Sequence, residues 1–89
     1  MKRGKLEIIR DILTIIRDNH NSIRITPLLR QTNISSSSFK EYFNEITKKG
    51  FITQAIDKRN HKTISLTEKG FRFIEKYKTI INFIDEFEL

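Results

Sequence analysis

The sequence predicts a mainly α-helical domain that carries one small β-hairpin. Apolar residues recur at helical spacing in three segments, residues 5–19, 33–50 and 68–87, and this period indicates helices with a buried face. Two short segments, 51–56 and 62–66, are typical of strands and are joined by a polar loop, which is the pattern of a hairpin. A chain of 89 residues, 37% hydrophobic and 31% charged, has room for one core and not for two.

Residues 5–19 are expected to form the first helix. Their aliphatic side chains fall into two adjacent rows that together make a wide apolar face, as in a helix packed against several neighbours. The rows are Leu6, Ile9, Leu13 and Ile16, and beside them Ile8, Ile12 and Ile15. Turn-forming residues at 19–22 end the helix.

A short strand and a second short helix are expected next. Residues 22–26 alternate, which predicts the strand. Thr26 and Pro27 then open a helix that ends at Gln31 or Thr32. Threonine can cap a helix, and proline at the first helical position loses no hydrogen bond. Residues 32–34 make the turn into the following helix.

The segment 33–50 predicts a recognition helix. Its aromatic and aliphatic residues share one stripe, Phe39, Tyr42, Phe43 and Ile46. Its opposite face carries only polar side chains, Ser37, Lys40, Glu41, Asn44 and Lys48. Ser35 or Ser36 can cap the helix start, and Gly50 can take the left-handed conformation after its end. The second helix, the turn and this helix therefore predict a helix-turn-helix.

The hairpin that follows is expected to have a basic tip. Ile64 and Leu66 alternate with polar neighbours in the second strand and should face inward. The cationic or titratable residues of the tip are Lys58, Arg59, His61 and Lys62. A basic hairpin placed directly after a helix-turn-helix predicts a wing.

The last predicted helix, residues 68–87, would span about 30 Å, which is longer than the small core requires. Thr67 is its expected cap, and Gly70 in its first turn suggests a close approach to the sheet. Phe71, Ile74 and Tyr77 can pack on the domain. Apolar residues continue beyond that point, and an exposed stripe of this size favours a partner. We therefore expect residues 1–66 to form the domain and residues 67–89 to pack on it and form a homodimer through Phe73, Tyr77, Ile80, Ile81, Ile84 and Phe87.

The positive charge is confined to one part of the chain. Residues 1–62 hold thirteen Lys and Arg against six Asp and Glu, a net +7, whereas residues 63–89 hold four against five, a net −1. This excess surrounds the predicted recognition helix, which favours a polyanion as partner over a merely solubilising surface.

Several other functions are disfavoured. The chain has no cysteine, and His20 and His61 are far apart without companion ligands, so neither a disulfide nor a metal site is expected. We find no serine with a recognisable base and no glycine-rich phosphate loop, so we expect neither an enzyme nor a cofactor. No separate ligand-sensing domain is evident, so we expect no small-molecule ligand. No apolar run approaches the roughly 18 residues of a membrane span, and we expect a cytoplasmic, nucleoid-associated protein.

Three segments resemble the small archaeal winged helix-turn-helix DNA-binding proteins: Lys5-Leu-Glu-Ile-Ile-Arg-Asp-Ile-Leu13, Lys49-Gly-Phe-Ile52 and Ile64-Ser-Leu-Thr-Glu-Lys-Gly70. The resemblance covers nearly the whole chain. It implies a dimer formed by an antiparallel coiled coil of the C-terminal helix, here expected to be shorter than is usual because the chain stops at Leu89. Members of the family occur in archaeal chromosomes and in viruses.

These observations together predict a homodimeric protein that binds double-stranded DNA sequence-specifically or semi-specifically, as a transcription regulator or a chromatin-associated protein. The recognition helix would read bases through Ser36, Ser37, Lys40, Glu41, Asn44 and Lys48. Glu41 repels phosphate, so it is expected either to accept from cytosine or to form an ion pair on the helix surface. Contacts to the DNA backbone would come from Lys58, Arg59, His61, Lys62, Thr26, Lys2 and Arg3. The alternative is a winged helix that binds RNA or an acidic protein instead.

Overall fold

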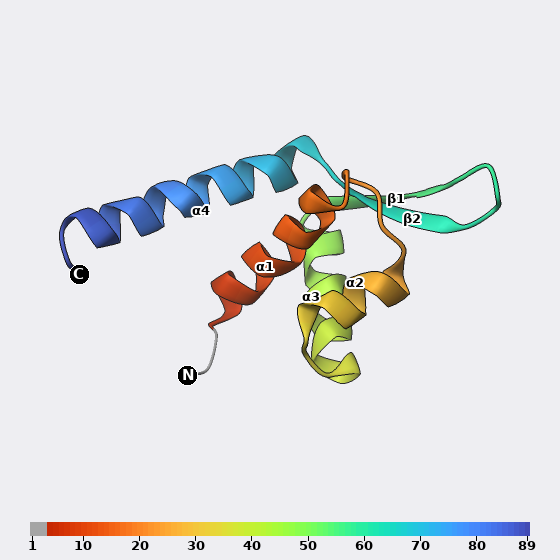
Figure 1. The fold of residues 1–89 in the computed structure, drawn as a ribbon, viewed down its shortest axis with the longest axis horizontal. Coiled ribbons are helices and arrows are strands. Elements are labelled where there is room, and N and C mark those ends of the chain that lie inside the picture. The colour runs from red at the N-terminus through yellow and green to blue at the C-terminus, as the bar shows by residue number, and fades with distance from the viewer. Residues whose placement is uncertain (1–3) are drawn as a thin grey trace.

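A computed structural model describes residues 4–89 as four helices and a two-stranded hairpin (Figure 1). The elements are α1 (Lys5–Asp18), α2 (Ile25–Thr32), α3 (Ser36–Lys48), β1 (Ile52–Ile56), β2 (Lys62–Leu66) and α4 (Glu68–Glu86). The hairpin and the C-terminal half of α4 project in opposite directions from the body formed by the other elements. The predicted fold class, mainly α with one hairpin and a long C-terminal helix, is confirmed.

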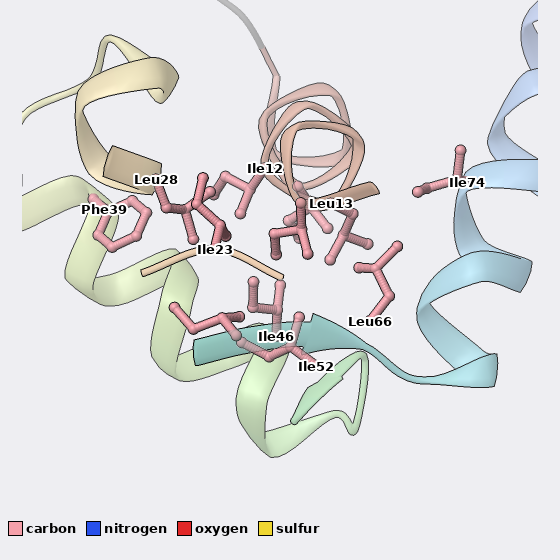
Figure 2. Close-up of a cluster of buried hydrophobic side chains, with 12 residues drawn as sticks. Ile12, Leu13, Ile23, Leu28, Phe39, Ile46, Ile52, Leu66 and Ile74 are labelled. Atoms are coloured by element: carbon pink, nitrogen blue, oxygen red, sulfur yellow. The ribbon is translucent and has the colours of Figure 1, made fainter. Parts of the chain in front are cut away.

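The core is built around α1, which contacts α2, β2 and α4. Ile12, Leu13 and Ile16 are completely buried, and this central place explains why the apolar face of α1 is so wide. Figure 2 shows residues of the other elements converging on this helix, among them Leu28 from α2 and Ile46 from α3. Leu6 is the exception in its row: it lies in the first turn of α1, beyond the edge of the core, and is 58% exposed.

The predicted strand at residues 22–26 is wrong except at one residue. Ile23 forms an isolated antiparallel bridge with Ile64, through N–H···O bonds of 3.1 and 2.7 Å between the two residues. The chain cannot continue as a strand because α2 already begins at Ile25.

The predicted start of α2 is also wrong. Arg24 is the N-cap, although its side chain makes no capping hydrogen bond, and Thr26 lies inside the first turn instead of capping it. Pro27 is therefore the third helical residue and not the first. It is tolerated there because the first amides of a helix lack an intrahelical acceptor, and the first such bond in α2 runs from the Leu28 N–H to the Arg24 carbonyl.

Both ends of α3 are formed as predicted. The Ser35 hydroxyl accepts a 3.2 Å hydrogen bond from the Ser38 amide, which satisfies one first-turn donor. Gly50 follows the helix with φ +77°, in the left-handed region that favours glycine. The hairpin pairs Ile52 with Leu66 at its base and Ile56 with Lys62 near its tip.

The start of α4 is joined tightly to the end of α3. The Thr67 hydroxyl accepts from the Gly70 amide at 3.2 Å and donates to the Gly50 carbonyl at 2.5 Å. The Lys69 ammonium donates to the Lys49 carbonyl at 2.7 Å. Gly70 lies so close to the Phe51 carbonyl that an added Cβ would collide with this backbone oxygen. The close approach predicted from Gly70 is thus confirmed.

Only the first half of α4 packs on the domain. Ile74 is buried against the core, and the Phe73 ring lies 5.1 Å from that of Phe51. Phe71 is 41% exposed, so the prediction that it packs on the domain is wrong: the helix turns residues 73, 74 and 77 inward and Phe71 away from them. The described part of the chain contains no helix that is both long and apolar enough to cross a bilayer.

Candidate nucleic-acid interface

Helix α3 presents a polar face that nothing in residues 4–89 covers. All six predicted base-reading residues are exposed: Ser36, Ser37, Lys40, Glu41, Asn44 and Lys48. On the opposite side Phe39 and Ile46 are buried, and the Phe39 and Phe43 rings stack with centroids 5.6 Å apart. The core therefore holds α3 in a fixed orientation while its hydrophilic side remains free to enter a groove.

Ion pairs distinguish the two glutamates of α3. Glu45 is bonded to Lys5 at 3.0 Å, which ties the start of α1 to α3. The ion pair expected for Glu41 is absent among the described residues. Its carboxylate is left exposed on the polar face, where it can accept a hydrogen bond from a base amino group such as that of cytosine.

A groove between α2 and α3 brings Thr26 beside Lys40 and Asn44. Its apolar floor includes Ile25, which is 50% exposed, and Leu29. Sequence reasoning missed both as site residues: Ile25 was assigned to a strand, and Leu29 was expected only to anchor the second helix. The floor is suited to the methyl groups of thymine, while the lysine and the amide on its rim can pair with base edges.

A second hollow lies along the other side of α3. It is lined by Glu41, Asn44, Glu45 and Lys48, together with Lys49, which the sequence analysis did not single out. Lys49 was missed because it follows the helix as its C-cap. Its exposed side chain adds a further cation at the end of the polar face.

The wing tip is cationic and internally ordered. Lys58, Arg59, His61 and Lys62 are all exposed. One oxygen of the Asp57 carboxylate accepts from the amides of Arg59 and His61, each at 2.9 Å. The hydrogen bond from the His61 amide lowers the pKa of Asp57 below its ordinary 3.8, so the turn is held by an ionised carboxylate at neutral pH. Because these bonds use backbone donors, the side chains of Lys58, Arg59 and Lys62 remain free, whereas His61 Nδ1 lies 3.9 Å from the second Asp57 oxygen.

The predicted contacts at Lys2 and Arg3 fall outside the described residues.

The predicted dimer residues divide into two groups. Phe73 and Tyr77 lie partly covered on their own domain, whereas Ile80, Ile81 and Phe87 are exposed and Ile84 is half-buried. Phe83 and Leu89 are also exposed and were missed, although helical spacing places Phe83 one turn before Phe87, with their rings 4.9 Å apart.

Known proteins share this arrangement. Residues 2–85 match the family described as winged helix-turn-helix. The solved structure of Sso10a-2, a DNA-binding protein from Sulfolobus solfataricus, is similar with a TM-score of 0.75 and 23% identity over 97% of this chain and 86% of that one. SSV1 F-93 is similar with a TM-score of 0.68 and 25% identity over 90% and 91% of the two chains.

A larger protein also contains this fold. MepR, a transcription regulator of the Staphylococcus aureus multidrug efflux pump MepA, has a TM-score of 0.76 and 14% identity. The match covers 89% of this chain but 59% of MepR. No curated protein sequence matches the chain.

Proposed function

Because the chain belongs to the winged helix-turn-helix family, we propose that it binds double-stranded DNA as a homodimer, in transcription regulation or in the organisation of the nucleoid. The observation that carries this proposal is the free polar face of α3 followed by a basic, ordered hairpin tip. The winged helix-turn-helix family is a DNA-binding and not an enzymatic family, which agrees with the expectation that the protein is not an enzyme.

Electrostatic attraction would bring the protein to the duplex. Cationic side chains release counterions condensed on DNA, and this release supplies a large share of the affinity. Lys58, Arg59 and Lys62 of the wing are the proposed phosphate contacts, with Thr26 at the start of α2 as a further one. Such contacts set the position of the protein on DNA without reading its sequence.

Base reading would fall to α3 in the major groove. Asn44 can form a pair of hydrogen bonds with adenine, and Lys40 can donate to guanine. The exposed Ile25 and its neighbour Leu29 lie in the same groove as these two residues. This combination supports some preference for sites in which an adenine is flanked by thymine methyl groups.

The proposal is tested by titrating the protein against duplex DNA, structured RNA and heparin at two salt concentrations. We expect duplex DNA to bind most tightly and to retain sequence preference at the higher salt, where non-specific charge contacts weaken. Tighter binding to RNA would indicate the alternative RNA-binding function. Equal binding to DNA and heparin at both salts would show attraction to polyanions without duplex recognition.

Asn44→Ala is expected to change sequence preference more than overall affinity. The loss of a bidentate contact to a base costs about 1–3 kcal/mol of discrimination at that position. Selection from random duplexes would show the change as a relaxed base at one position of the site. Lys62→Ala is the matched control, since it should weaken all sequences equally. The same selected site for wild type and Asn44→Ala would exclude Asn44 from base reading.

The homodimer is supported by the apolar side chains that α4 leaves in solvent. Ile80, Phe83 and Phe87 are each more than half exposed on the projecting half of the helix, and contiguous apolar surface of this kind usually marks a contact. Ile80→Glu is therefore expected to yield monomers in sedimentation experiments. Asn82→Glu places the same charge on the polar side of the same turn and should leave the dimer intact. If both variants remain dimeric, another surface joins the chains.

A further inference from the structure

A groove of about 320 Å³ lies between α1 and α4 and is separate from the face proposed for DNA. Its floor is apolar and is formed by Ile74, Tyr77 and Ile81 of α4. Its walls are basic, with Arg10 and Arg17 on α1 and Lys78 on α4. A cationic groove with an apolar floor suits a segment that carries both carboxylates and apolar side chains.

The groove holds polar groups that its own chain does not fully use. The Arg10 guanidinium lies 5.0 Å from the centre of the Tyr77 ring and pairs with the adjacent Asp11 at 2.8 Å, so it is fixed in place. Lys78 is exposed and has no ion pair within residues 4–89. Within the same residues, Arg17 forms an ion pair only with its neighbour Asp18. The Thr14 hydroxyl is buried at the groove wall and has no hydrogen-bond partner in the described structure.

Helix α4 has a matching charge gradient. Residues 68–79 hold four Lys and Arg against two Glu, whereas residues 80–89 hold three acidic residues and no basic one. The acidic residues Asp85, Glu86 and Glu88 are exposed and make no ion pair in the part of the chain that the structure describes. They lie among the exposed apolar residues Phe83, Phe87 and Leu89. The end of α4 thus has the chemistry that the groove requires.

We propose that the groove between α1 and α4 receives the acidic segment 85–89, which begins in the last turn of α4, from a second copy of the chain. The inference rests on the proposed homodimer and adds α1 to its contact surface. In a two-fold symmetric pair each copy gives its segment to the other, so the contact is made twice.

Helical geometry supports the fit. If two antiparallel α4 helices cross at Ile81, Asp85, one turn beyond it, lies opposite Tyr77 of the partner, one turn before it. Glu88 follows in a closing turn, where the Leu89 amide bonds the Ile84 carbonyl at 2.9 Å. The carboxylates of this segment then meet the basic wall of the groove. A parallel pair would instead place the two acidic ends side by side, where like charges repel.

The exposed Leu6 extends the groove on the α1 side. It lies one turn before Arg10 on the same side of α1 and is 58% exposed in the single chain. Because α1 runs antiparallel to α4, Leu6 lies nearest the crossing point, where the partner's Ile81 provides the apolar cover that Leu6 lacks. Two exposed residues, Leu6 and Ile81, would thereby be removed from water in one contact.

A charge-swap experiment on the full chain tests the proposal. One variant reverses the groove, Arg17→Glu with Lys78→Glu, and a second reverses the segment, Asp85→Lys with Glu88→Lys. Each variant alone places like charges in both symmetric contacts, and we expect its dimer dissociation constant to rise by about tenfold to a hundredfold. In an equimolar mixture both contacts join opposite charges, so we expect heterodimers to form at the wild-type concentration range, as measured by native mass spectrometry.

The outcomes separate this inference from the homodimer itself. A wild type that stays monomeric at all concentrations would overturn both. A wild-type dimer that both charge reversals leave unchanged would keep the homodimer and overturn the groove contact. The finding that an acidic segment of another protein occupies the groove would do the same. Arg30→Glu, on the exposed side of α2, changes the net charge without touching the groove and should leave the dissociation constant unchanged. Rescue in the mixture excludes misfolding as the cause of the loss.

Discussion

Lys58→Glu combined with Arg59→Glu is expected to weaken binding to all duplexes by about a hundredfold at low salt and to flatten the salt dependence of binding. Each phosphate contact contributes about 0.9 to the slope of log K against log salt, and a dimer carries two wings. The substitution both removes these contacts and introduces charges that DNA repels. A mobility-shift titration over a series of salt concentrations measures both effects.

The structure predicts that this double variant folds normally. Both side chains are exposed, and the hairpin turn is held by the Asp57 carboxylate through backbone amides, which the substitution retains. Arg72→Glu with Lys76→Glu is the matched control, because it makes the same change in net charge on α4, away from the hairpin. Equal losses in the two variants would attribute the effect to net charge, and unchanged affinity of the wing variant would remove the wing from the mechanism.

Gly70→Ala is expected to lower the free energy of unfolding by about 2–3 kcal/mol, as overpacking of a well-packed site does. The new Cβ would collide with the Phe51 carbonyl oxygen, and this neighbour is backbone that cannot rotate away. Helix α4 would have to shift, and the shift would disturb the adjoining pair of Phe51 and Phe73. In a small domain with roughly 5 kcal/mol of stability, this is a large share.

Urea unfolding followed by circular dichroism measures this loss. Gly4→Ala is the control, because no atom lies within 4 Å of a Cβ added there and its φ of −75° suits alanine. Gly4 is the N-cap of α1, where alanine is a poorer residue than glycine, so we expect that variant to lose no more than about 1 kcal/mol. Equal stability of the Gly70→Ala protein would show that α4 can move away from Phe51 at no cost.

The sequence allowed the helices and the hairpin to be predicted because their signals are local. The stripe through Phe39 and Ile46, the Ser35 cap and Gly50 all lie within one segment and agree with each other. The same agreement allowed the free polar face of α3 to be predicted, since residues opposite a buried stripe must point outward.

The failures occurred where a distant residue decides the structure. Ile23 pairs with Ile64, a partner far along the chain, so its alternating neighbourhood could not show that the strand is a single bridge. The rotation of α4 about its own axis is likewise set by packing against α1, which is why Phe71 was placed inward although Phe73 is the residue that packs. Helical spacing shows which residues lie on the same face of a helix, but it does not show which side of that face packs against the core.

Neither the groove between α2 and α3 nor the groove between α1 and α4 could be predicted from the sequence, and the reason is the same. One joins Ile25 of α2 to Lys40 of α3, and the other joins Arg10 of α1 to Tyr77 of α4. Each depends on how two helices pack, and no local pattern encodes that. The exposed residues of the site could be predicted individually, whereas the surfaces they form together could not.

The joint between α3 and α4 has a consequence for the geometry of the DNA target. Thr67 and Lys69 are bonded to the carbonyls of Gly50 and Lys49, which ties the start of the helix that would join two copies to the end of the helix that would enter the groove. In a dimer paired through α4, the separation of the two reading helices would therefore be fixed by the length and crossing point of α4. Such a protein would demand half-sites at one spacing and one helical phase, and would discriminate against the same half-sites when they are a few base pairs further apart.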